Sequence, residues 1–139
     1  MMSRPHAALL LLAAGLLALV ASACGGGAGA SEEVTIAIHY SGFVPEEVEV
    51  PAGVPVTITL RNDDPIEHEW IIGPTEVHER HRNGTEPYHD QIPTEVTVPA
   101  FESRTTTITF ANPGVLKYVC HLPGHEAYGM VGSLTVTED

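Results

Sequence analysis

The fold is constrained most by a series of short segments in which apolar and polar residues alternate, each separated from the next by proline, glycine or a polar turn. Alternation with a period of two is typical of strands with one buried face, and these segments lack the period of an amphipathic helix. Many short strands of this kind indicate two packed antiparallel sheets with Greek-key connections. We therefore predict an all-β sandwich of about eight strands, at residues 34–40, 48–50, 54–60, 67–72, 94–98, 103–110, 115–120 and 131–137.

Residues 74–93 depart from this pattern because they are polar and contain an Asn-Gly pair and several prolines. We predict a long surface loop here, with no more than one helical turn. The loop holds His78, His81 and His89 among acidic residues. Two histidines three residues apart can bind a metal ion, but such spacings are common in solvated polar loops, and the sequence leaves both interpretations open.

The beginning of the chain has the layout of an export signal. Arg4 precedes an apolar run at residues 7–20, and small residues follow it. The run is shorter than the ~20 apolar residues of a typical membrane-spanning helix. We predict a signal peptide at residues 1–23, a flexible glycine-rich linker at 24–31 and one folded domain at 32–139. Residues 20–24 resemble the lipobox of bacterial lipoproteins, which implies a lipid on Cys24; secretion with ordinary cleavage nearby is the alternative.

Charge restricts the partners that the domain can bind. All 18 acidic residues of the chain, but only five of its six basic residues, lie after residue 31, which gives the domain a net charge near −13 (5 − 18). This balance argues against nucleic acid and against anionic lipid bound through a basic patch. A basic protein partner or a simply solvated acidic surface remains compatible with it.

The residues with the most specific chemistry lie between Cys120 and Met130, where a cysteine, a histidine and a methionine follow one another at five-residue intervals through His125. A thiolate, two imidazoles and a weak axial thioether form the ligand set of a blue-copper electron-transfer site. His68, on a separate predicted strand, can supply the second imidazole. With Cys24 before the domain, Cys120 is the only thiol inside it, which excludes a dinuclear copper centre bridged by two thiolates.

These residues resemble a known family. The region 34–137 is similar to cupredoxins of the plastocyanin–azurin type, and the loop Cys-x₄-His-x₄-Met is most similar to that of rusticyanin. The resemblance implies a cupredoxin fold, one type 1 copper cycling between Cu(I) and Cu(II), and the metal ligands His68, Cys120, His125 and Met130. It also implies that electrons pass through the His125 ring edge, within an apolar rim that Pro123, Ala127, Tyr128 and Gly129 can form.

Two residues beside the predicted ligands need separate interpretation. Glu69 follows the first ligand, where azurin and plastocyanin have an asparagine that helps tie the ligand loops together. An ionised Glu69 near the metal would favour Cu(II) and lower the reduction potential. His121 neighbours Cys120 on a strand and should therefore point to the opposite face, so we interpret it as structural or solvent-facing.

Three functions are consistent with this sequence. The first is an exported, lipid-anchored electron carrier at the outer face of the membrane or in the periplasm. It would be a monomer that exchanges electrons with a redox protein donor and acceptor of the cytochrome, reductase or oxidase type. The second is copper storage or delivery, for which the histidines of residues 74–93 are the support. The third, a copper enzyme, normally requires further copper sites and further domains, so we expect no enzymatic activity.

Overall fold

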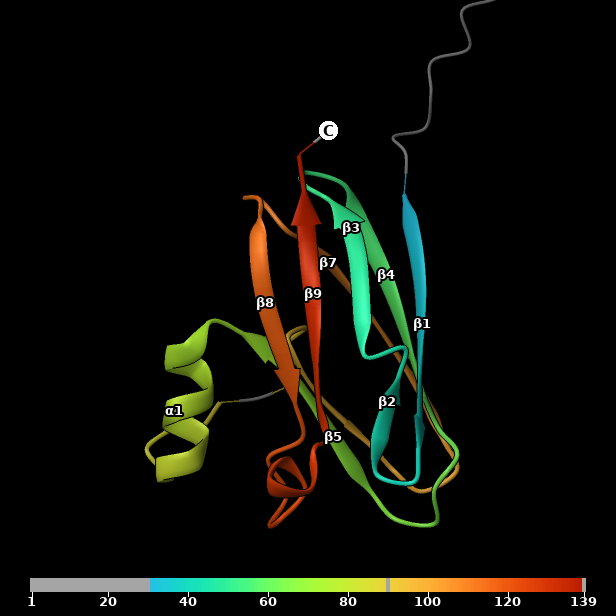
Figure 1. The fold of residues 1–139 in the computed structure, drawn as a ribbon, viewed down its shortest axis with the longest axis vertical. Helices are drawn as coiled ribbons and strands as arrows, with labels where there is room; N and C mark the ends of the chain where they lie inside the picture. Colours follow the sequence, from blue (N-terminus) through green and yellow to red (C-terminus); the bar gives the residue numbers. More distant parts are fainter. Residues whose placement is uncertain (1–30, 90, 139) are drawn as a thin grey trace, which may run out of the picture.

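The computed structural model describes residues 31–89 and 91–138, and these residues form two packed β-sheets (Figure 1). The predicted all-β sandwich is therefore confirmed, with one strand more than expected: the short β2, which the sequence analysis missed. The described residues form the strands β1 (Glu32–His39), β2 (Gly42–Val44), β3 (Glu47–Pro51), β4 (Pro55–Asn62), β5 (His68–Gly73), β6 (Glu95–Val98), β7 (Ser103–Thr109), β8 (Gly114–Val119) and β9 (Val131–Thr137), the helix α1 (Thr75–Asn83) and the 3-10 helix η1 (Glu126–Tyr128).

The first sheet has the strand order β2-β1-β4-β7, and the second has the order β3-β9-β8-β5-β6. The prediction of antiparallel sheets was wrong in part, because β1 pairs in parallel with β4 and β3 pairs in parallel with β9. Inward-facing residues of both sheets form one apolar core, as the period-two pattern predicts. In β4, for example, Val56, Ile58 and Leu60 are completely buried and alternate with more exposed residues. Trp70 and Tyr118, completely buried in the second sheet, are the largest core side chains.

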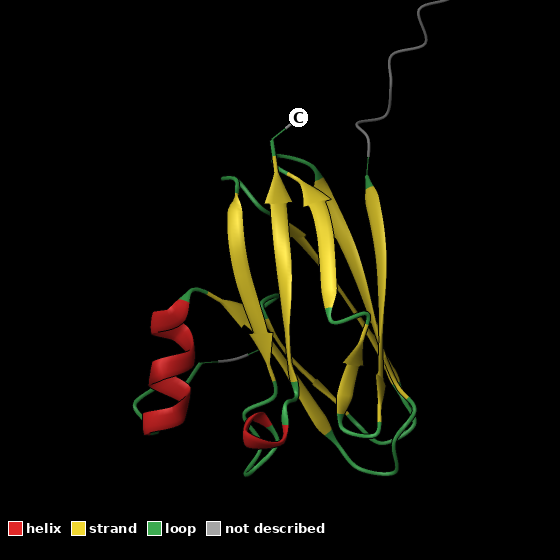
Figure 2. Cartoon of the chain, viewed as in Figure 1, coloured by secondary structure: helices red, strands yellow, loops and turns green. Residues whose placement is uncertain are grey.

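Four loops meet at the end of the sandwich opposite the C-terminus (Figure 2). They join β1 to β2, β4 to β5, β6 to β7 and β8 to β9. Two backbone hydrogen bonds hold the loop between β4 and β5 to its neighbours: Asp63 N donates to Ile38 O in β1, and Phe101 N, in the loop between β6 and β7, donates to Asp64 O. The predicted metal ligands lie at this end.

The segment at 74–93 was predicted as a loop with at most one helical turn, and this prediction was wrong, because α1 extends over nine residues. Gly84 ends the helix in the left-handed conformation, and its backbone amide bonds the last carbonyls of the helix. The helix shows no apolar stripe in the sequence because its inward-facing side chains are mostly polar: His78 is buried, and Val77, Arg80 and His81 are half-buried. The side chain of His78 anchors it, with Nε2 3.2 Å from the carbonyl oxygens of both Gly73 and Lys117.

Candidate metal centre

The four predicted ligands come from two places in the second sheet. His68 is the first residue of β5, and Cys120 follows the last residue of β8. These strands are antiparallel neighbours with Ile71 opposite Val119, which places His68 and Cys120 at the same end of the sandwich. His125 and Met130 lie in the loop between β8 and β9, which returns over Cys120.

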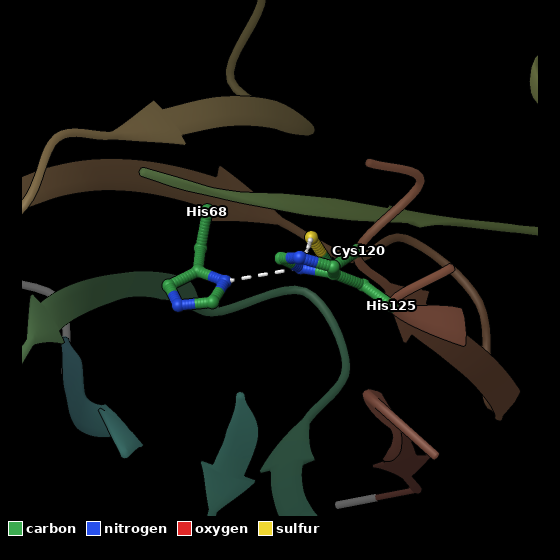
Figure 3. A group of neighbouring side chains, drawn as sticks. All are labelled: His68, Cys120 and His125. Atoms are coloured by element: carbon green, nitrogen blue, oxygen red, sulfur yellow. Dashed lines mark hydrogen bonds between the residues drawn. The ribbon is translucent and has the colours of Figure 1, made fainter. Parts of the chain in front are cut away.

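Three donor atoms converge at this end, as Figure 3 shows. His125 Nδ1 lies 3.3 Å from His68 Nδ1 and 3.3 Å from Cys120 Sγ. Two nitrogens bound to one metal ion at ~2.0 Å, with a trigonal or tetrahedral angle between them, lie ~3.3–3.5 Å apart. The observed spacing therefore fits a shared metal ion, and a thiolate with two imidazoles is a donor set that suits copper.

The tautomer of His68 is fixed by Asp64. Nε2 of His68 lies 3.0 Å from Asp64 Oδ2, so it donates its hydrogen to this carboxylate and leaves Nδ1 with a lone pair directed at the other donors. Burial lowers the pKa of His68, although Asp64 opposes this effect, so the imidazole is neutral near pH 7. Neutral imidazole is the form that binds a metal.

The Cys120 sulfur is completely enclosed and accepts a hydrogen bond from the Glu69 backbone amide at 3.4 Å. Burial raises the pKa of the thiol, and the backbone amides of Glu69 and Leu122 oppose that rise. These amides point at the sulfur and favour its anionic form, which is the form that ligates metals.

A sequence model of the cupredoxin-like domain family matches residues 8–136 of this chain. The chain belongs to this family. Among curated proteins, the copper-resistant cuproprotein CopI of Pseudomonas aeruginosa is 28% identical over an alignment 142 positions long, which covers 78% of this chain and 78% of CopI. The relatedness therefore extends over most of both proteins.

Solved cupredoxin structures share the fold. Dithionite-reduced auracyanin from Roseiflexus castenholzii is 27% identical, covers 78% of this chain and 99% of its own, and gives a TM-score of 0.65. Auracyanin A of Chloroflexus aurantiacus, described as a "blue" copper protein, is 24% identical over 78% of this chain and all of its own, with a TM-score of 0.61. The predicted resemblance to blue-copper cupredoxins is thus confirmed.

The loop between β8 and β9 ties the remaining ligands of this cupredoxin to Cys120. Cys120 N donates to the Met130 carbonyl at 3.2 Å, and Met130 N donates to the His125 carbonyl at 3.0 Å. Met130 is completely buried directly before β9. Gly124 and Gly129 have φ values of 86° and 95°, a backbone conformation that allows the loop to turn this tightly. His68, Cys120, His125 and Met130 therefore form a type 1 copper-like site.

The site reaches solvent at His125, whose residue is half-buried, whereas His68 and Cys120 are enclosed. Pro123, Ala127, Tyr128 and Gly129, the predicted rim, are all exposed. Three apolar side chains from the other loops at this end are exposed as well: Tyr40, Ile66 and Phe101.

Asp64 is a functional residue that the sequence analysis missed. Its carboxylate accepts hydrogen bonds from the backbone amides of Tyr40 and Ser41, both at 2.7 Å, besides the one from His68. Burial alone would raise the pKa of Asp64, but these hydrogen bonds together hold it below its ordinary value. The only sequence signal is its position four residues before the first ligand, inside a predicted turn.

The helix α1 contacts the loop between β8 and β9, which we call the copper loop. This contact between the helix and the loop could not be predicted from the sequence. Arg82 makes a bidentate ion pair with Glu126, the neighbour of His125. His121 Nε2 lies 3.0 Å from His78 Nδ1, and its ring stacks on His81. His121 is therefore structural, as one of the two interpretations held, and it is not solvent-facing.

The predicted signal peptide at residues 1–23, Cys24 and nearly all of the linker lie outside the described residues. Within the part of the chain that the structure describes, no helix is long and apolar enough to cross a membrane.

Proposed function

We propose that this cupredoxin is a mononuclear type 1 copper protein that carries single electrons. His68, Cys120 and His125 would hold the ion as equatorial ligands, with Met130 as the axial ligand. Bound copper supplies the one-electron couple between Cu(I) and Cu(II). The observation that carries the proposal is the convergence of two imidazole nitrogens and one thiol sulfur on a single point. The ligands are supported by two sheet strands, hydrogen-bonded amides and Asp64, so little has to move when the electron leaves.

The surface around His125 is suited to brief contact with another protein. The apolar rim and the exposed Tyr40, Ile66 and Phe101 share one end of the sandwich. Clustered exposed apolar side chains are typical of interaction sites, and apolar contact lets a partner approach the half-buried His125 ring closely. The acidic remainder of the surface would attract a basic partner from a distance and raise the association rate.

We propose further that the protein is exported, monomeric and held by a lipid on Cys24 at the outer face of the membrane or in the periplasm. The leader-like residues 1–23 and the lipobox-like sequence before Cys24 support this location. The partners would be a redox protein donor and a redox protein acceptor, not nucleic acid. No substrate is transformed in this function, so the protein is not an enzyme.

The test is the visible spectrum after Cu(II) is added to the purified metal-free protein. We expect an intense thiolate-to-copper band at one copper per chain, and complete loss of this band in Cys120→Ser. Cys24→Ser makes the same substitution at the other cysteine of the chain and should keep the band. A pale wild-type protein, or a band that survives Cys120→Ser, would contradict the proposal.

Copper handling is the second candidate function, because the relative in Pseudomonas aeruginosa is a copper-resistant cuproprotein. The two functions differ in what leaves the protein. An electron carrier exchanges electrons with a reduced or oxidised partner and keeps its copper, whereas a delivery protein transfers the ion. Stopped-flow mixing of the loaded protein with a copper chelator distinguishes them: retention of copper over many redox turnovers favours electron transfer.

The charge of Glu69 gives a further prediction. Burial raises the pKa of this carboxyl group, and neighbouring His81 and the His121 backbone amide oppose the rise. We expect Glu69→Gln to raise the reduction potential by roughly tens of millivolts at a pH where Glu69 is ionised, because the substitution removes a negative charge beside Cys120 but keeps the shape. Spectroelectrochemical titration measures the midpoint. Glu67→Gln, at an exposed position two residues away, is the control and should leave the potential nearly unchanged; equal effects of the two variants would contradict the prediction.

A further inference from the structure

A second group of metal-binding side chains lies outside the copper-like site. Among the residues that the structure describes, two groups of at least three histidine, cysteine or acidic residues bring their ligand atoms within 4.8 Å of one another. One is the copper-like site. The other contains Glu86 and His89, from the segment after α1, and Glu95, the first residue of β6.

The distances around Glu95 show a compact arrangement. Glu95 Oε2 lies 3.0 Å from His89 Nε2 and 3.4 Å from His81 Nε2, in the last turn of α1. Glu86 Oε1 lies 3.8 Å from the same nitrogen of His89. Two imidazoles and two carboxylates, contributed by a helix, a loop and a strand, therefore meet at one place.

Hydrogen bonds fix the orientation of two members of this group, His81 and Glu86. His81 Nδ1 lies 2.9 Å from the Val77 carbonyl and donates its hydrogen there, so the other nitrogen, Nε2, carries the lone pair whenever the ring is neutral, and it lies on the side of Glu95. A histidine fixed in this way by a backbone carbonyl is the usual arrangement of a metal ligand. Arg80 bonds Glu86 Oε2 at 2.6 Å and lowers the pKa of Glu86, which keeps this carboxylate ionised with Oε1 toward His89.

The group also lies beside an accessible cavity. This cavity, of about 190 Å³, is lined by His81, His89 and Glu95, and Glu69 contributes a second carboxylate to it. Arg80 offsets the charge of Glu86, so Glu69 and Glu95 leave an excess of negative charge around the two imidazoles when the histidines are neutral and both carboxyl groups are ionised. A divalent cation would neutralise that excess.

We propose that His81, Glu86, His89 and Glu95 form a second metal site, which binds a divalent transition metal through nitrogen and oxygen. Imidazole and carboxylate donors without sulfur suit Zn(II) or Cu(II), whereas Cu(I) prefers the soft sulfur ligands of the first site. The site is independent of the electron-transfer proposal, because it shares no ligand with the copper-like group.

Equilibrium dialysis with Zn(II), followed by elemental analysis, tests this site in protein already loaded with copper. We expect one zinc per chain in addition to the copper. The double variant His89→Ala/Glu95→Gln should lose at least ~100-fold in zinc affinity, because even partners outside the ligand shell contribute ~10–100-fold. The blue band, read in the same samples, reports the first site separately and should be unchanged.

The control variant is His39→Ala/Glu49→Gln, which makes the same two substitutions on β1 and β3 at exposed positions. It should bind zinc like the wild type. Failure of the wild-type protein to bind zinc beyond its copper site would overturn the proposal. Zinc binding of equal affinity in the two double variants would overturn it as well.

Discussion

Replacing Asp64 by alanine is expected to destabilise the metal-free protein by about 3 kcal/mol or more and to weaken copper binding at least ~10-fold. The Asp64 side chain is 8% exposed, and its two oxygens accept hydrogen bonds from the backbone amides of Tyr40 and Ser41 and from His68. Alanine leaves all three donors without their acceptor, two of them in the turn between β1 and β2. Each unsatisfied buried donor costs ~1–3 kcal/mol. Copper binding weakens because nothing then fixes the tautomer and orientation of His68.

Urea unfolding of the metal-free protein and a copper competition titration measure these two effects. Asp64→Asn keeps the shape but has one acceptor oxygen, so it should lie between the wild type and alanine. Asp63→Ala is the matched control, because the neighbouring Asp63 pairs with Arg61 at the surface. An exposed pair of this kind contributes ~0–1 kcal/mol. Equal losses of stability in Asp63→Ala and Asp64→Ala, or an unaffected copper affinity in Asp64→Ala, would contradict this role of Asp64.

The copper-like site and most strands could be predicted from the sequence because their signals are local. Alternation along β4 reports directly which of its residues face the core, and the spacing from Cys120 to Met130 lies within one loop. Only His68, the fourth predicted ligand, lies far from this loop in the sequence. The strand pattern still predicts it, because a residue at the start of β5 and another after the end of β8 lie at the same end of the sheet.

The missed features depend on contacts between distant segments. α1 has no apolar stripe, and it is stabilised by hydrogen bonds from His78 to β5 and β8 and by the Arg82–Glu126 pair, which no local pattern reveals. The carboxylate of Asp64 binds Tyr40 and Ser41, more than twenty residues away, although its sequence context reads as an ordinary polar turn. Helix propensity is a weak predictor wherever tertiary contacts decide the outcome.

The second large effect is the dependence of stability on pH through His121. The His121 side chain is 6% exposed, and burial lowers its pKa from 6.5 to about 4, with nearby His78, His81 and Arg82 contributing and Glu126 opposing. Between these two pH values the unfolded chain binds a proton that the folded protein does not. Stability is therefore complete above about pH 6.5 and decreases as the pH falls toward 4, by roughly 3 kcal/mol for this residue.

His121→Gln should remove this part of the decrease. A glutamine amide can replace the imidazole Nε2–H that donates to His78, so stability at pH 7 should change little. Urea midpoints of the metal-free protein at pH 7 and pH 4.5 measure the difference, because without metal the competition between protons and the metal ion for the ligands does not contribute. The slope of stability against pH should be smaller in the variant but not zero, since burial also lowers the pKa of His78.

The control is His39→Gln, which removes a half-exposed histidine of β1 and should retain the wild-type slope. An unchanged slope in His121→Gln would show that the histidine cluster beneath α1 does not limit acid stability.

A reduced slope has a consequence for the copper loop. His121 follows Cys120, and the helix that covers it also holds Glu126 beside His125. Protonation of His121 would then loosen the helix that braces the loop, so acid should weaken copper binding before it protonates Asp64.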